Sequence, residues 1–319
     1  MLYNPKVSVI IPTYNRLPLL KEALDSVVAQ TCTNWECIVV NDYPPDQQKV
    51  ETILKQLNDE RFILINHKVS QGGNTARNTG IRHSRGQIIA FLDDDDIWDI
   101  KKLEIHYQFH CKYPNIGLFY SNVLFIWSNN EIPPYSPNKP LPKNVTKSFL
   151  EGNFCPPTSS CVTVLSKAFN DCGFFDENLV SFQDWDMWLR ISEKYEFGLI
   201  QQTLVYFRQH LSERTSQNLE KRLQGLEQIE VKWKTQFTDI SLFHYKYLNA
   251  AYRTSTRQLF LIPKNQKNKI YSNLIKYMEE EYNKDTCSPK TILILCFCLL
   301  IPRRFYLWWE NIKSAKLRL

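Results

Sequence analysis

Four consecutive carboxylates, Asp93 to Asp96, directly follow the apolar run Ile88–Leu92. Four like charges in one place repel one another and resist burial, so positive charge is expected beside them. One explanation is a helix N-terminus that Asp96 caps. The other is Mg²⁺ or Mn²⁺, which proteins hold with one or two carboxylates together with substrate phosphates. Because a cap needs only one aspartate, the excess favours a metal on Asp93 and Asp95, where it would neutralise a diphosphate leaving group.

Strand and helix patterns alternate along the first half of the chain, and they set where these carboxylates lie. Strand-like runs occupy residues 7–12, 35–42, 61–66 and 87–92, with a helical pattern at 17–29 and a loop that leads into a short helix at 72–84. Strands joined by helices predict right-handed parallel crossovers and a doubly wound α/β sheet. Ligands bind outside the carboxyl ends of such strands, so the polar segments there should share one rim. The side chains concerned are Tyr14, Arg16, Asp42 and Asp93–Asp96.

The second half is less regular. Strands are expected at 116–126, 159–166 and 197–210, a helix that buries tryptophans at 183–195, and a proline-rich surface loop at 129–144. After about residue 216 a helical stripe begins, formed by Leu219, Leu223, Leu226, Ile229 and Trp233. We therefore predict a catalytic domain over 1–215, a helical appendage over 216–285 and a tail over 286–319.

The tail is basic and amphipathic. It opens with an apolar run at 291–301, which is shorter than the roughly 20 residues that span a bilayer. Aromatic and basic residues follow, a combination that suits an element lying on an anionic membrane surface. The alternative is a helix docked on the protein with its basic residues in solvent.

Charge and cysteine content narrow the class of protein. The net charge is +6, but six basic residues stand against Glu310 alone from Lys290 onward. The main body is therefore nearly neutral, and nucleic acid is not expected as a partner.

The nine cysteines are odd in number and show no CxxC pair, which favours free thiols in a reducing compartment. A strand-like run by Val7 leaves no room for a signal peptide. We expect a cytoplasmic protein with its tail at the inner face of the membrane.

Four motifs in this order and spacing resemble the family-2 glycosyltransferases with the GT-A fold. They are "VSVIIPTYNR" (7–16), "NTARNTGI" (74–81), "AFLDDDDIW" (90–98) and "QDWDMWLR" (183–190), and the resemblance covers roughly residues 5–210. It implies a Rossmann-like mixed sheet and transfer of a sugar from a nucleotide-sugar donor, usually with inversion and with bound Mg²⁺ or Mn²⁺.

The resemblance also implies which residues hold the nucleotide. Pro12, Thr13 and Tyr14 match the segment that lines the base pocket, where an aromatic ring can stack on the base. Arg16 closes the same segment. Asp42 matches the acidic residue that accepts a hydrogen bond from the base ring. The alternatives are core packing for Tyr14 and an ordinary turn for Asp42.

The loop around Asp42 departs from the family pattern. "NDYPPD" stands where relatives commonly have two acids followed by glycine and serine. Asn41 is uncharged, and Tyr43-Pro44-Pro45 is a stiffer segment. This departure leaves the choice of base open.

For the diphosphate and metal, the resemblance assigns Asp93 and Asp95 to the Asp-x-Asp metal motif. It places Asp94 near the ribose or sugar hydroxyls and His210 near the metal or pyrophosphate. Arg77 can reach a phosphate or the metal-binding carboxylates, with an internal salt bridge to the aspartates as the alternative.

The catalytic base is expected in "QDWDMWLR". Many relatives have Glu-Asp where this chain has Gln183-Asp184, and the aspartate is kept. In an inverting transfer one carboxylate must deprotonate the acceptor hydroxyl as it attacks. Asp184 is favoured over Asp186, and helix capping is the alternative role for it.

The predicted function is an inverting, metal-dependent glycosyltransferase that moves a sugar from a UDP-sugar or another nucleotide-sugar. The acceptor is expected to be a glycan or lipid-linked molecule in cell-surface polysaccharide synthesis, bound near 129–144 or 216–285. Two alternatives remain: a silent nucleotide-sugar-binding module of the same fold, and a sugar nucleotidyltransferase, for which "PTYNRLP" lacks the glycine-rich triphosphate loop.

Overall fold

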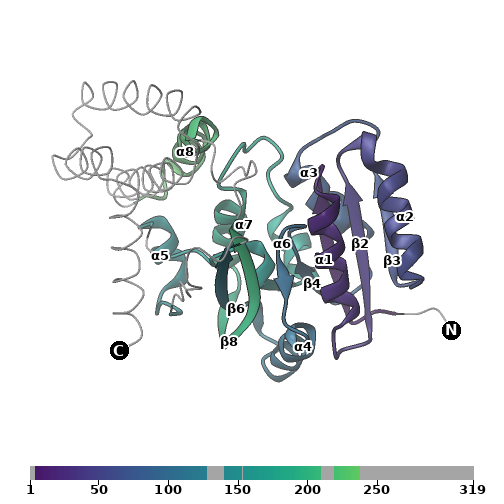
Figure 1. The fold of residues 1–319 in the computed structure, drawn as a ribbon. Coiled ribbons are helices and arrows are strands. Elements are labelled where there is room, and N and C mark those ends of the chain that lie inside the picture. The colour runs from purple at the N-terminus through teal and green to yellow at the C-terminus, as the bar shows by residue number, and fades with distance from the viewer. Residues whose placement is uncertain (1–3, 128–139, 153, 210–218, 238–319) are drawn as a thin grey trace, which may run out of the picture.

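The computed structural model describes residues 4–127, 140–152, 154–209 and 219–237 (Figure 1). Its strands are β1 (Val7–Thr13), β2 (Trp35–Asn41), β3 (Phe62–Asn66), β4 (Ile88–Phe91), β5 (Ile97–Trp98), β6 (Ile116–Trp127), β7 (Val162–Leu165) and β8 (Glu196–Gln209). Its helices are α1 (Leu17–Val28), α2 (Gln47–Leu57), α3 (Gly73–His83), α4 (Lys102–Lys112), α5 (Val145–Leu150), α6 (Ser166–Cys172), α7 (Gln183–Ser192) and α8 (Leu219–Trp233). Two 3₁₀ turns, η1 (Pro44–Asp46) and η2 (Ser159–Cys161), complete the described elements.

The eight strands form one mixed sheet in the order β3-β2-β1-β4-β7-β6-β8-β5. Neighbours within β3-β2-β1-β4 are parallel, and β7 pairs antiparallel with both β4 and β6. The predicted mixed α/β sheet is therefore confirmed. The strand order reverses between β1 and β4, and such a switch point opens a crevice at the carboxyl ends of the two strands.

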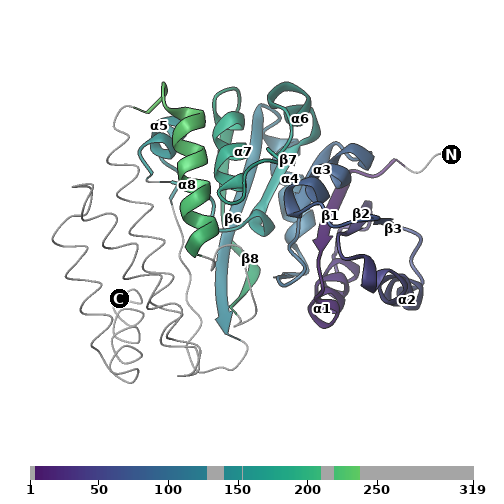
Figure 2. The ribbon, with the colours of Figure 1, turned by 90° about the horizontal axis from the view of Figure 1, so that it is seen from above.

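The core of the parallel half follows from its sequence. All seven residues of β2, and all but Pro12 of β1, are buried. Such runs form when helices cover both faces of a parallel sheet. Figures 1 and 2 show α1 and α2 on one face and α3 on the other. This packing fixes the strand ends that carry the site.

One local prediction needs correction, and one alternative is excluded. The segment 159–166 begins with the turn η2 rather than with strand, because the Ser160 hydroxyl bonds to the buried Asp96 carboxylate. Asp96 does not cap a helix: β5 follows it, and α4 begins only at Lys102, after an N-cap residue, Lys101, with no side-chain cap bond. The segment 197–210 forms the single strand β8 as far as Gln209.

Helix α8 packs directly onto α7, whose residues Trp185, Trp188, Leu189 and Ile191 are all buried as the sequence predicts. The indole Nε1 of Trp233 donates a 2.9 Å hydrogen bond to Oδ1 of Asp186, and Nζ of Lys232 lies 2.9 Å from the same oxygen. A Cβ added at Gly225 would lie 2.6 Å from Cβ of Ser181. The described start of the predicted appendage is thus closely joined to the catalytic part.

Several predictions fall outside the described residues: the proline-rich loop over 129–139, His210, the appendage beyond 237, and the tail 286–319. All six cysteines within the described part are free thiols. In that part of the chain, no helix combines the length and apolar character needed to cross a membrane.

Candidate active site

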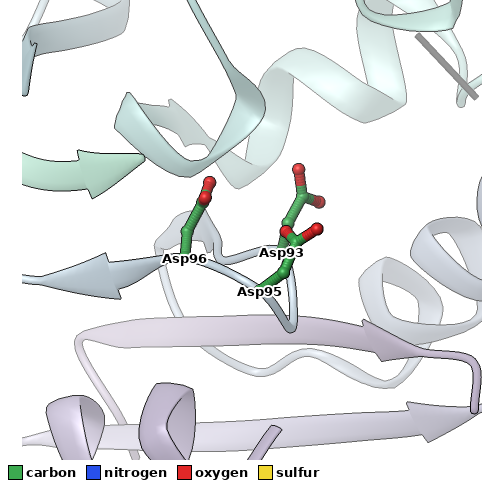
Figure 3. A group of neighbouring side chains, drawn as sticks. All are labelled: Asp93, Asp95 and Asp96. Atoms are coloured by element: carbon green, nitrogen blue, oxygen red, sulfur yellow. The ribbon is translucent and has the colours of Figure 1, made fainter. Parts of the chain in front are cut away.

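The loop after β4 gathers three aspartates. Figure 3 shows Asp93, Asp95 and Asp96 on this loop, with their carboxylate groups pointing to the same side. One ligand oxygen from each lies within 4.8 Å of the other two. Carboxylate oxygens are the ligands that Mg²⁺ and Mn²⁺ prefer. The loop therefore offers a donor set that suits a hard divalent cation.

Two of these aspartates already face positive charge. Oδ1 of Asp93 lies 2.6 Å from Nη2 of Arg77, and no other described residue bonds to its side chain. Oδ2 of Asp95 lies 2.9 Å from Nη1 of Arg16. Guanidinium groups thus stand beside the two carboxylates predicted to hold the metal, as expected where the local negative charge must be offset. The residues fit a divalent cation on Asp93 and Asp95.

Asp96 is engaged differently. It is fully buried, and its Oδ2 accepts a 2.6 Å hydrogen bond from the Ser160 hydroxyl. Its Oδ1 accepts a 3.2 Å bond from the backbone N–H of Arg208. The Ser160 hydroxyl in turn accepts from the backbone N–H of Asp93 at 3.1 Å. Asp96 and Ser160 therefore hold the loop 93–96, called the metal loop here after its proposed ligand, against η2 and β8.

Asp94 ties the metal loop to the end of β1. Its Oδ2 accepts from the Thr13 hydroxyl at 2.9 Å and from the Tyr14 backbone N–H at 3.3 Å, and its Oδ1 lies 3.2 Å from Nη1 of Arg16. Burial and the Asp95 charge raise the pKa of Asp94 to about 6, although Arg16 and the two hydrogen bonds oppose this. The predicted contact of Asp94 with sugar hydroxyls stays a prediction.

The motif "NTARN" places Arg77 on α3. Side chains four residues apart share one helix face, so Asn74 and Asn78 point to the same side of α3. The amide of Asn74 donates to the backbone carbonyls of Asp176 and Leu179, each at 2.9 Å. Asn78 exchanges two 2.9 Å hydrogen bonds with the backbone of Phe175. The two asparagines thus fix α3, with Arg77 on it, against the segment that leads into α7.

Asp184 lies in the first turn of α7 and faces Arg77. Its Oδ1 is enclosed and has no hydrogen-bond partner among the described residues. Burial raises the pKa of this carboxyl, the Arg77 guanidinium lowers it, and the Asp93 charge raises it. Arg77 is thus close enough to act on both the metal loop and Asp184. A carboxylate with an unused, enclosed oxygen beside a metal loop can accept a proton from a bound hydroxyl.

Ser159 adds to this environment. Its fully buried hydroxyl lies near enough to lower the pKa of Asp184, but it makes no well-formed hydrogen bond within the described chain. Ser159 is therefore a weak neighbour of the carboxyl rather than a firm donor.

Asp186, two residues further along, is in a different situation. It is fully buried and bonded to Arg190, Lys232 and Trp233. Its carboxylate stabilises the contact between α7 and α8, and it is not open to an acceptor.

Two residues with left-handed backbone flank the site. Asn15 has φ 52°, and Phe182, the N-cap of α7, has φ 61°. Asparagine adopts this region readily, whereas a bulky residue such as Phe182 is strained there, and such strain collects at functional sites. The turn that leads to Asp184 therefore carries strain.

The base end of the site lies at the carboxyl ends of β1 and β2. Tyr14 is 51% exposed, and its ring centroid lies 4.9 Å from that of Tyr43, with the two rings tilted by 62°. Asp42 is buried behind them. Its carboxylate accepts from His67 Nδ1 (2.7 Å), the Ser70 hydroxyl (2.9 Å), and the backbone N–H groups of Gln71 and Gly72 (2.8 Å each). These bonds outweigh burial and lower the pKa of Asp42.

The structure thus gathers Thr13, Tyr14, Arg16, Asp42, Arg77, Asp93, Asp94, Asp95 and Asp184 at one end of the sheet. Pro12 lies in β1 among them. Sequence reasoning missed Ser160 and the roles of Tyr43 and His67. The sequence did point to Tyr43, because it stands where relatives commonly have a glycine. Ser160 carried none, because its partners Asp93 and Asp96 are more than 60 residues away.

Comparison with known proteins agrees with this arrangement. The profile described as "Glycosyl transferase family 2" matches residues 8–174, which includes the metal loop and stops before Asp184. An uncharacterized glycosyltransferase, MJ1057 of Methanocaldococcus jannaschii, is 34% identical over 210 residues, 64% of this chain and 71% of that protein. The Escherichia coli protein named UDP-Glc:alpha-D-GlcNAc-diphosphoundecaprenol beta-1,3-glucosyltransferase WfgD is 36% identical over 126 residues, 40% of this chain and 48% of that protein.

Solved structures show the same fold at lower identity. The mannosyltransferase PcManGT from Pyrobaculum calidifontis, in complex with GDP-Man and Mn²⁺, aligns over 98% of this chain and 88% of its own with a TM-score of 0.57 and 18% identity. The family profile covers more than half of the chain, and the sheet, its switch point and the aspartate loop occur together. The chain is a glycosyltransferase enzyme and belongs to glycosyl transferase family 2.

Proposed function

We propose that this enzyme transfers a sugar, with inversion, from a nucleoside-diphosphate sugar to a glycan or lipid-linked acceptor in polysaccharide synthesis. The observation that carries the proposal is the placement of Arg77 between Asp93 and Asp184. It supports a leaving-group site at Asp93 and a general base at Asp184, on either side of one cation. The name of WfgD, a UDP-glucose enzyme with a diphosphoundecaprenol acceptor, supports a UDP-sugar and a lipid-linked acceptor.

The residues divide the reaction between them. Asp184 takes the proton of the acceptor hydroxyl as that oxygen attacks the anomeric carbon from the face opposite the nucleotide. The bond from that carbon to the diphosphate oxygen breaks, and the nucleoside diphosphate leaves with its electron pair. The Arg77 and Arg16 guanidinium groups stand beside the departing charge and stabilise it. Pro12, Thr13 and Tyr14 line the base end.

Asp93 and Asp95 would hold Mg²⁺ or Mn²⁺, which when bound supplies charge stabilisation to the diphosphate leaving group. His210 lies outside the described residues, and its predicted approach to the metal remains part of this proposal. The basic tail would bring the enzyme to an anionic membrane surface at the cytoplasmic face, where lipid-linked acceptors lie. Residues 216–285 would serve as the helical appendage near the acceptor.

The test is a panel of nucleotide-sugars incubated with Mn²⁺, with and without a chelator, and with undecaprenyl-diphosphate sugars as acceptors. We expect one donor to release nucleoside diphosphate in a metal-dependent way, and Asp95→Asn to abolish this release. Asp25→Asn, in an exposed pair with Lys21, is the matched control and should behave like the wild type. Metal-independent turnover, or full activity of Asp95→Asn, would contradict the assignment.

The product's anomeric configuration tests inversion separately. Proton NMR of the product should show the configuration opposite to that of the donor, and retention would overturn the role of Asp184.

A further inference from the structure

The metal loop leads directly into a buried tryptophan, Trp98, in β5. The indole Nε1 of Trp98 donates a 2.8 Å hydrogen bond to the backbone carbonyl of Ser160, in the turn η2. The Ser160 hydroxyl bonds in turn to the backbone N–H of Asp93 and to the carboxylate of Asp96. The segment 93–98 therefore clasps Ser160 at three points, which are the two ends of the metal loop and the indole.

Lys102, the first residue of α4, brings a second donor to η2. Its Nζ donates a 3.3 Å hydrogen bond to the backbone carbonyl of Cys161, the residue after Ser160, and lies 5.4 Å from the centroid of the Trp98 ring. Lys102 is fully buried and has no carboxylate partner within the described part of the chain. Because an amine is costlier to bury than a hydrocarbon chain, its hydrogen bonds have to offset that cost.

A line of buried side chains fixes the amine of Lys102. Its Nζ lies 2.8 Å from Nε2 of His106, one turn further along α4. Nδ1 of His106 lies 2.9 Å from the hydroxyl oxygen of Thr163 in β7, and Nε2 of His110 lies 2.9 Å from the same oxygen. All of these residues are buried. The position of Lys102 is therefore set by α4 and β7 together.

The turn η2 needs such support from outside. It is three residues long, and its backbone bond from the Cys161 N–H to the Thr158 carbonyl measures 3.3 Å. Short 3₁₀ turns have poorer hydrogen-bond geometry than an α-helix has. The indole of Trp98 and the amine of Lys102 donate to two successive carbonyls of this turn, and they thereby fix the Ser160 hydroxyl as well.

We propose that Trp98 and Lys102 are positioning residues for the metal. They fix η2, and η2 holds the Ser160 hydroxyl that keeps the metal loop in the shape that binds a divalent cation. Neither residue offers a metal ligand, because an indole N–H and an ammonium group are donors only. This inference rests on the proposed function, which places the cation on Asp93 and Asp95.

Binding of Mn²⁺ to the full chain tests the role of Trp98 without any turnover. The EPR signal of free Mn²⁺ gives the dissociation constant, measured once in excess UDP and once in excess GDP. Trp98→Phe keeps an aromatic ring and removes the N–H. We expect the dissociation constant for Mn²⁺ to rise about 3- to 10-fold, less than for a group that supports a ligand directly.

Trp188→Phe is the matched control. Trp188 is also fully buried, but its Nε1 has no hydrogen-bond partner among the described residues. Both variants lose ring volume from the core, and both should lower Tm, whereas only Trp98→Phe should weaken Mn²⁺. An unchanged dissociation constant in Trp98→Phe, or an equal rise in both variants, would overturn the inference.

A double-mutant cycle tests whether Trp98 acts through Ser160. Once Ser160→Ala has removed the hydroxyl, Trp98→Phe should weaken Mn²⁺ no further, because the connection to the metal loop is already broken. A purely structural role would not give this result. Losses that multiply in the double variant would show that Trp98 acts by another route, and they would overturn the inference.

Lys102→Met is the second variant, and it keeps the question decidable if Trp98→Phe does not fold. Methionine retains the apolar part of the side chain and removes an amine that is costly to bury. We expect the dissociation constant for Mn²⁺ to rise about threefold, because Cys161 loses its donor. Lys101→Met, at the exposed neighbouring lysine, removes the same charge and should keep the wild-type value.

The wild-type measurement separates the two levels of the argument. Failure of the wild-type enzyme to bind Mn²⁺ with either nucleotide would overturn the metal assignment of the proposed function and this inference together. Wild-type binding that persists unchanged in Lys102→Met and Trp98→Phe would overturn the inference alone.

Discussion

The Ser160 hydroxyl donates a 2.6 Å hydrogen bond to the carboxylate of Asp96, a residue 64 positions earlier in the chain. The same hydroxyl accepts from the backbone N–H of Asp93 at 3.1 Å. One buried serine thus connects the supporting aspartate of the metal loop to a proposed metal ligand. Groups that orient ligands from behind govern metal affinity almost as strongly as the ligands themselves.

We predict that Ser160→Ala lowers Mn²⁺ affinity by about 10- to 100-fold, because the backbone of Asp93 loses its support. The measurement is a titration of transferase activity with Mn²⁺. Its neighbour Ser159, also fully buried, makes no well-formed bond to the loop, so Ser159→Ala is the matched control and should keep the wild-type metal affinity. Equal loss in both variants would indicate general damage to η2.

Ser159→Ala should instead alter the pH profile. Ser159 lowers the pKa of Asp184, so its removal raises that pKa further. The base must be deprotonated to act, and activity falls as pH falls through its pKa. The acid limb of kcat/KM should therefore move to higher pH in Ser159→Ala and stay in place in Ser160→Ala assayed at saturating metal. An unmoved limb in Ser159→Ala would remove Ser159 from the environment of the base.

Two aspartates of α7 should separate catalysis from stability. Asp184→Asn removes the proposed base and should lower kcat by about 10²- to 10⁴-fold with little change in Tm. Asp186→Asn leaves Lys232 and Arg190 without their buried counter-ion and should lower the free energy of unfolding on the order of 3 kcal/mol. The enzyme that remains folded should turn over normally. The reverse pattern, with kcat lost in Asp186→Asn and kept in Asp184→Asn, would exchange the two roles.

Arg77 should affect turnover and metal binding in opposite directions. Arg77→Met removes a cation from the leaving-group side and should reduce kcat by about 100-fold. It also leaves the Asp93 charge unopposed, so the apparent affinity for Mn²⁺ should rise. Arg82→Met, on the same helix in a largely exposed pair with Glu177, is the control for both measurements. Weaker Mn²⁺ binding in Arg77→Met would show that the guanidinium orients Asp93 instead.

A buried basic cluster on α4 should make stability depend on pH. Lys102 is fully buried, its Nζ lies 2.8 Å from Nε2 of His106, and burial lowers the pKa of Lys102 to about 7. An unfolded lysine titrates near pH 10.5, so above pH 7 the unfolded state binds the extra proton. The free energy of unfolding should then rise with pH by up to about 1.4 kcal/mol per pH unit.

The window for this measurement is pH 7 to about 9. Above pH 9, the buried thiol of Cys161 lowers the free energy of unfolding as the pH rises. Burial raises the pKa of this thiol to about 11, so the thiol ionises first in the unfolded chain. Below pH 7, the two buried histidines add to the effect. Burial lowers the pKa of His106 and His110, so the free energy of unfolding falls further as the pH falls through the pKa that a histidine has in the unfolded chain. Denaturant unfolding of Lys102→Met should show a smaller slope within the window. An identical slope would mean that Lys102 stays charged in the folded protein.

The sequence predicted the elements of the parallel half well, because each is encoded locally. Buried strand runs and the amphipathic α1, with Leu20, Ala23, Leu24 and Val27 on its inner face, need no knowledge of distant residues. The carboxyl ends of parallel strands meet at one edge, so the shared rim followed from the alternation alone. The strand predicted over 159–166 was wrong at its start, where the turn η2 forms. The alternative that Asp96 caps a helix is excluded, because its carboxylate accepts from Ser160 instead.

The sequence by itself determined that acidic side chains and an arginine meet at the end of a parallel sheet, since hydrophobic periodicity and motif order are properties of the chain. Only the tertiary structure decided what each carboxylate does. Asp42 is filled by donors from the loop 67–72, Asp96 by η2 and β8, and Asp186 by α8, whereas Asp184 keeps an enclosed oxygen without a partner among the described residues. The physical reason is that the function of a carboxylate depends on its burial and its donors. Those donors come from segments that only folding brings near.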